Sequence, residues 1–182
     1  NNYTINMPDL EIKEIEKGLP GITPTAAGQL SEACMVCLHR SNHPENVTMT
    51  LTGDFNKDYN IIWEDSFNEQ IDRTYQDQEY TTEHGAICIS ALLAIKETDY
   101  TIIERSRKGT GFDYWLGYKD AIPFMKSARL EVSGIFKGGQ KPLETRFKKK
   151  IKQTNQSDSI NIPAYISIVE FSTPIAKFAQ KK

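Results

Sequence analysis

Apolar residues at helical spacing predict three helices in this chain. After the breaker cluster LPGITP, Thr23 is placed to cap a helix that has Pro24 at its first position. The pattern that follows predicts an amphipathic helix over residues 24–40. The segment over about residues 82–97 is apolar on nearly every side, which is typical of a buried helix. A third helix is expected in LETRFKKKIKQT, where apolar residues recur every four positions.

Alternation of apolar and polar residues predicts strands elsewhere. The runs VTMTLT and YNIIWE alternate on either side of the turn GDFNKD and predict a β-hairpin. Four further segments are predicted strands: YTIIERS, FDYWLGY, SARLEVSGIF and PAYISIVEFSTP. Short turns between the first three favour an antiparallel meander. From residue 82 the predicted order is therefore α-β-β-β-α-β, whereas residues 66–80 have no clear pattern.

This order indicates an α/β fold of the α+β type with two parts. Residues 1–80 are expected to form an N-terminal extension, a helix and a β-hairpin, that packs on a core of residues 81–182. The chain has 182 residues, of which 38% are hydrophobic and 25% charged, and this suits one globular domain with a full core.

Composition argues against several classes of protein. No apolar run approaches the roughly 20 residues that cross a bilayer, so no membrane partner is expected. The first residues, NNYTINMPDLEIKEIEKG, are acidic and polar, unlike a signal peptide. Three cysteines, an odd number, argue against a disulfide scaffold and for a reducing, cytoplasmic location. The segment CMVCLHRSNH suggests zinc, but on one helix its cysteines and histidines face different ways, which favours core roles for Cys34 and Cys37.

Charge is distributed unevenly along the chain. Residues 1–100 contain 6 Lys and Arg and 17 Asp and Glu, a net charge of −11, whereas residues 101–182 contain 16 and 7, a net charge of +9. This asymmetry indicates a basic working surface on the C-terminal half. The alternative is that the two halves attract each other, or that the acidic part contacts another subunit.

Acidic residues occur in two predicted strands that are neighbours. Glu131 and Ser133 share one face of their strand because side chains alternate, and Asp113 enters the preceding strand 18 residues earlier. Two carboxylates directed at one point repel each other unless a cation lies between them. Mg²⁺ and Mn²⁺ prefer such oxygen ligands, so the pattern predicts a metal site.

A structural role for the same acids is the alternative. Asp113 could pair with Arg105 or Arg107 across the turn RKGTG, and Glu131 could pair with Arg129 or with a helix lysine. The metal site and structural pairing are both open from spacing alone.

The acids and the element order resemble those of the PD-(D/E)XK nuclease superfamily. The resemblance covers about residues 82–172, with Asp113 as the first acid and with Glu131 and Ser133 at the two ends of the family's (D/E)-x-K motif. Glu83, at the start of the preceding helix, matches a position where many members have a further metal-binding acid; the alternative is that it only favours the helix dipole. The resemblance implies a PD-(D/E)XK-like core and a nuclease that uses Mg²⁺ or Mn²⁺ to cut DNA.

The chain departs from the family at Ser133, which stands where the family has a lysine. That lysine orients the water or stabilises developing charge, and loss of such a donor costs around 10²–10³ in rate. Some members supply the amine from a neighbouring element, and the candidates here are Lys149, Lys108 and Lys137. The open alternative is a catalytically silent scaffold that uses this fold for protein or nucleic-acid contact.

Basic residues near the C-terminus are candidates for contact with a DNA backbone. The candidates are Arg146, Lys148, Lys149, Lys152 and Lys108. A solvated helix face is the alternative. A chain this small, with an acidic first half, is expected to work in a larger complex, as a homo-oligomer or beside a targeting or motor subunit. By family habit, that complex is expected to be a prokaryotic defence or DNA-processing assembly.

Overall fold

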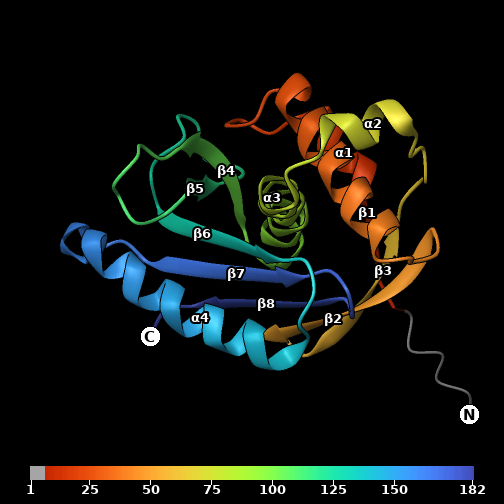
Figure 1. Ribbon diagram of the computed structural model, residues 1–182. Helices are drawn as coiled ribbons and strands as arrows, with labels where there is room; N and C mark the ends of the chain where they lie inside the picture. Colours follow the sequence, from red (N-terminus) through yellow and green to blue (C-terminus); the bar gives the residue numbers. More distant parts are fainter. Residues whose placement is uncertain (1–6) are drawn as a thin grey trace, which may run out of the picture.

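A mixed sheet of eight strands runs through the computed structural model, which describes residues 7–182 (Figure 1). The strands lie in the order β1-β3-β2-β8-β7-β6-β5-β4. Their bounds are β1 Asp9–Glu11, β2 Asn46–Gly53, β3 Lys57–Ile62, β4 Tyr100–Arg105, β5 Tyr114–Tyr118, β6 Ala128–Ile135, β7 Ala164–Glu170 and β8 Ile175–Gln180. The helices are α1 Pro24–Arg40, α2 Glu69–Thr74, α3 Gln78–Glu97 and α4 Gln140–Thr154, with 3₁₀ helices at Ile12–Lys17 and Asn155–Ile160. The predicted mixed α/β class is confirmed.

The element order predicted from the second helix onward is confirmed in α3, β4, β5, β6, α4 and β7. Strands β4, β5 and β6 form an antiparallel meander, whereas β7 runs parallel to β6. A parallel neighbour requires a crossover connection, and α4 supplies it. Figure 1 shows α3 on one face of the sheet and α4 on the opposite face, so β6 and β7 are covered on both sides.

The start of α3 differs from the predicted one. The helix begins at Gln78 rather than near residue 82, because the Asp77 side chain accepts a hydrogen bond from the Tyr80 N–H (3.0 Å) and caps the helix there. Glu83, predicted at the helix start, therefore lies in the second turn of α3, where a helix-dipole role is weaker.

The last segment is a hairpin, β7–β8, where one strand was predicted. The Glu170 carboxylate holds the turn by accepting hydrogen bonds from the N–H groups of Ser172 (2.9 Å) and Thr173 (3.0 Å). Helix α2, in the stretch without a clear pattern, is capped by Asn68, whose side chain accepts from the Ile71 N–H at 2.9 Å. Side-chain caps of this kind leave no trace in apolar periodicity.

The N-terminal part of the chain belongs to the same sheet. The predicted β2–β3 hairpin is confirmed, and α1 begins as predicted at Pro24, with the Thr23 side chain as its cap. Strand β2 pairs in parallel with β8, from Thr50↔Ile175 onward. The predicted division at residue 80 falls inside α3, and the two parts share one sheet.

Two apolar clusters form the core, one on each face of the sheet. The larger cluster joins α1 and α3 to Leu130 and Val132 of β6. The smaller one joins Leu143 and Phe147 of α4 to β7 and β8. Since Leu130 and Val132 face α3, the alternating residues of β6 face α4.

The three cysteines have free, buried thiols in the larger cluster, in agreement with the core role predicted for Cys34 and Cys37. Burial raises the pKa of the Cys37 thiol to about 12, which makes it a poor metal ligand at neutral pH. Across residues 7–182, none of the helices combines the length and the apolarity that crossing a membrane requires.

Gly134 of β6 allows α3 to approach the sheet closely, because a Cβ there would lie 2.5 Å from the Thr82 carbonyl oxygen. We expect Gly134→Ala to lower the free energy of unfolding by about 1–3 kcal/mol, since the backbone of α3 must move away. The control is Gly28→Ala in α1, where a Cβ meets no atom within 4 Å, and it should raise stability by about 0.5–1 kcal/mol. Urea unfolding of the two variants measures both effects. Equal stabilities would contradict the close packing of α3 on β6.

Candidate active site

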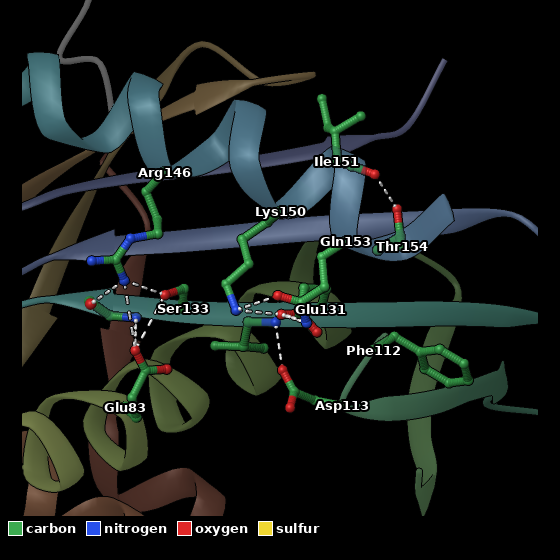
Figure 2. Close-up of polar contacts among 12 residues, drawn as sticks. Glu83, Phe112, Asp113, Glu131, Ser133, Arg146, Lys150, Ile151, Gln153 and Thr154 are labelled. Carbon is green, nitrogen blue, oxygen red and sulfur yellow. Dashed lines mark hydrogen bonds and ion pairs between the residues drawn. The ribbon is translucent and has the colours of Figure 1, made fainter. Parts of the chain in front are cut away.

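The edge of β6 is open beside the start of β5. Backbone pairing between the two strands reaches Leu130, and β6 then continues alone on this side. Two carboxylates replace the missing strand: the Val132 N–H donates to Asp113 Oδ2 at 2.8 Å, and the Gly134 N–H donates to Glu83 Oε1 at 3.2 Å (Figure 2). Asp113 and Glu83 are therefore placed by the hydrogen-bonding demand of a buried strand.

A glycine turn delivers Asp113 to this edge. Gly111 has a φ of +83°, and a Cβ on it would lie 2.5 Å from the Gln153 carbonyl oxygen of α4. Both facts require glycine, and they dock the turn on the C-terminal end of α4. Arg105 lies 3.5 Å from Asp113, with 57% of its side chain exposed, so this ion pair is weak.

Glu131 is a buried carboxylate that faces α4. Its Oε1 accepts hydrogen bonds from Lys150 Nζ at 2.6 Å and from Gln153 Nε2 at 2.9 Å. Within residues 7–182, no hydrogen-bond donor reaches the buried Oε2. Burial, and after it the negative charge of Asp113, raises the pKa of Glu131 to about 8, although Lys150 opposes the shift. A cation would stabilise the ionised form of this pair of acids.

A second polar group surrounds Ser133. Its Oγ donates to Glu83 Oε1 at 3.2 Å and accepts from Arg146 NH1 at 2.7 Å, while Arg146 lies 3.8 Å from Glu83. Burial raises the pKa of Glu83. Figure 2 shows this group next to the first along β6, with Arg146 directed from α4 and Glu83 from α3. Ser133 and the β6 backbone thus hold the Glu83 carboxylate near Asp113 and Glu131.

The amine beside Glu131 comes from Lys150, a residue that the motif did not predict. Of the predicted candidates, Lys108 lines a cavity of about 430 Å³ together with Asp113 and Glu131. Lys137 is exposed just after β6. The helix candidates Lys148, Lys149 and Lys152 are exposed on α4.

The spacing of α4 explains why Lys150 reaches the site. Arg146, Lys150 and Gln153 recur at i, i+4 and i+7 and so form one side of the helix. Leu143 and Phe147 form the adjacent side, which packs in the smaller core cluster. This angular position next to the apolar side was the signal available in the sequence.

Of the two partners predicted for Glu131, Arg129 is wrong and a helix lysine is found. Arg129 does not pair with Glu131, because it lies 3.1 Å from Asp158 and donates to Ser157 at 2.7 Å. Glu131 pairs instead with a helix lysine, Lys150.

The donor set of the site suits a hard divalent cation. Asp113 and Glu131 offer carboxylate oxygens, and the unpartnered Oε2 of Glu131 is one of them. Across residues 7–182, no group of three or more His, Cys, Asp or Glu side chains is arranged to hold a metal ion. A cation bound by two acids would complete its shell with water and phosphate oxygens, as Mg²⁺ commonly does.

Comparisons with protein-family models, with curated proteins and with solved structures find no match to this chain.

Glu131 should make the protein less stable as the pH rises in metal-free buffer. Its pKa is about 8 in the folded protein against an ordinary value of 4.5, so between these values the native state keeps a proton that the unfolded state has lost. The free energy of unfolding should therefore fall across this range, on the order of a few kcal/mol, and level off above it.

Glu131→Gln removes the ionisable group, so the free energy of unfolding of the variant should fall less steeply with pH. Urea unfolding of parent and variant between about pH 5 and pH 9, with chelator present, compares the two curves. Parallel curves would show that Glu131 does not carry this proton.

Proposed function

We propose that this protein is a metal-dependent nuclease of the PD-(D/E)XK type that acts on DNA, with Mg²⁺ or Mn²⁺ as its cofactor. The observation that carries the proposal is the position of Lys150, whose Nζ lies 2.6 Å from Glu131 Oε1. Ser133 cannot carry the charge that the family's lysine provides, and Lys150 offers that charge from α4 instead. The acids assigned to the metal are Asp113 and Glu131.

The arrangement of strands supports this proposal. An antiparallel meander, β4-β5-β6, is followed by a helical crossover and a strand parallel to β6, and α3 precedes them all. This is the order that the resemblance implies. The acids lie where β5 and β6 part, and both line the cavity of about 430 Å³ beside this edge, through which substrate would approach.

The chain's own residues have distinct roles in the proposed reaction. When bound, Mg²⁺ or Mn²⁺ supplies a Lewis acid for phosphate oxygens and lowers the pKa of a bound water. Asp113 and Glu131 would hold the ion through their oxygens. Lys150 holds a positive charge where negative charge develops on the phosphate. Gln153 accepts from Lys150 at 3.1 Å and donates to Glu131 at 2.9 Å, and so orients both.

The polar group around Ser133 supports the group around Glu131. Glu83, proposed as an assisting acid, is fixed by Ser133 and by the backbone of β6. Arg146 donates to Ser133 at 2.7 Å and keeps 37% of its side chain exposed. A guanidinium in this position can bind a phosphate of the DNA strand.

A catalytically silent scaffold for protein or nucleic-acid contact is the second candidate, and one observation favours it. Each acid has a cationic partner already, since Arg105 lies 3.5 Å from Asp113 and Lys150 lies 2.6 Å from Glu131. In a scaffold these would be structural ion pairs. A protein partner or homo-oligomer, a cytoplasmic location and a prokaryotic defence assembly stay predictions in either case.

Lys150→Met separates the two candidates. In a nuclease it should lower Mn²⁺-dependent cleavage of DNA by about 10²–10³, because a charged donor is lost from the transition state. Lys141→Met removes the same charge from an exposed position on the same helix and should leave the rate at the parental value. Cleavage is followed by gel electrophoresis of labelled DNA. A parent protein without any Mg²⁺- or Mn²⁺-dependent cleavage would rule out the nuclease and leave the scaffold.

Reversal of the exposed lysines of α4 tests the predicted DNA contact. If Lys148, Lys149 and Lys152 line the path of a DNA backbone, their replacement by Glu should weaken binding. The slope of log K against log salt should then decrease by about 0.7–0.9 for each phosphate that the variant no longer neutralises. Fluorescence anisotropy at several salt concentrations measures this slope. An unchanged affinity and slope would identify this side of α4 as solvated surface.

A further inference from the structure

A cavity of about 650 Å³ lies beside Asp113, between α1 and α3. Figure 1 shows these two helices next to each other on the same face of the sheet. The first turns of α1 contribute Ala26 and Gln29 to its wall, and α3 contributes His84 and Ile87. The N-terminal part of the chain therefore forms one side of the candidate active site.

The charged residues that line this cavity are Glu83, Arg105 and Asp113, and its other lining residues include no Asp, Glu, Lys or Arg. Leu30 and Ile87 give it apolar walls, and Gln29 and His84 give it hydrogen-bonding groups. The Gln29 amide donates to the Tyr80 hydroxyl at 2.8 Å, and His84 Nδ1 donates to the Tyr80 carbonyl oxygen at 2.8 Å. This contact uses Nδ1 and not Nε2 of the His84 ring. Apolar walls with a few fixed polar groups suit a flat heterocycle.

A second cavity, of about 430 Å³, lies on the other side of Asp113 and has a different character. Arg107 and Lys108 line it, and Arg105 and Asp113 belong to both cavities. Cationic side chains of this kind attract phosphate groups. A nucleotide lying across Asp113 would therefore have its phosphate near Arg107 and Lys108 and its base near Leu30 and Ile87.

A base can enter such a cavity only if it is not stacked in a duplex. An enzyme reaches an individual base either on a single strand or by turning the nucleotide out of the helix, which costs unstacking energy. The cavity volume of about 650 Å³ is that of a small-molecule site, closed on one side by α1. Of the described residues that line it, Arg105 is the one Lys or Arg, so the cavity itself has little to hold a second backbone.

We propose that the cavity between α1 and α3 receives an unpaired base, so that the substrate strand is single-stranded DNA. This inference rests on the proposed function, because it names the substrate of the same site. It assigns the N-terminal helix a part in substrate selection, with Gln29 and His84 as the residues that contact the base.

Binding of base-containing and abasic DNA tests this inference without any cleavage. The probes are a fluorescein-labelled single-stranded 12-mer of mixed sequence and its counterpart with abasic residues at the central positions, both in chelator. The full chain should bind the base-containing strand about tenfold more tightly or better, as expected for one accommodated base. Equal affinities, or no binding of either probe, would overturn the inference.

A matched pair of variants locates the effect. Ala26→Trp fills the cavity from an exposed position, and Thr25→Trp adds the same bulk at an exposed neighbour that does not line the cavity. Ala26→Trp should abolish the difference between the two probes, whereas Thr25→Trp should retain it. If Ala26→Trp retains the difference, the base lies elsewhere and the inference fails.

The same measurements distinguish failure of the proposed nuclease function from failure of the base cavity. Base-dependent binding that Ala26→Trp abolishes, in a protein without metal-dependent cleavage, would support the base cavity and remove only the nuclease. Metal-dependent cleavage of duplex DNA with equal affinity for the two probes would leave the nuclease and overturn the single-stranded substrate.

Discussion

The parting of β5 from β6 after Leu130 is the constraint on which the candidate site depends. A buried strand that loses its neighbour must satisfy its N–H groups in another way. In this chain the carboxylates of Asp113 and Glu83 do so, at Val132 and Gly134. Both acids are thereby fixed at one edge, and the charges gathered there follow from a backbone requirement.

Helix α4 determines how those charges are balanced. One side of it packs in the smaller core cluster, and the adjacent side carries Arg146, Lys150 and Gln153 toward β6. Burying Glu131 costs free energy, which Lys150 offsets only in part, as the raised pKa of Glu131 records. Sites that must bind ions or stabilise transition states commonly lower the stability of the fold in this way.

Sequence reasoning predicted the acids better than it predicted their partners. The expected pairing of two successive strands, together with strand alternation, was sufficient to bring Asp113 near Glu131, because successive strands commonly pair. The lysine was missed because the position of Lys150 beside the apolar stripe of α4 indicates proximity to the sheet but not which strand residue it meets, and the tertiary position of the β6 edge decides that. The position of Glu83 within α3 depended on the Asp77 cap, which has no periodic signature. Strand β8 was missed for the same reason, since its turn is held by Glu170.

The pairing of β2 with β8 has a consequence for how the chain folds. Thr50 and Ile175 are partners in the sheet, so β2 cannot complete its hydrogen bonds until almost the whole chain is available. Contacts so distant in sequence form slowly, and meanwhile the hairpin β2–β3 carries an unpaired edge that could join the edge of another nascent chain. The net charge of −11 on residues 1–100 opposes such encounters by mutual repulsion. We therefore expect the acidic first half to disfavour aggregation until the last strand is available.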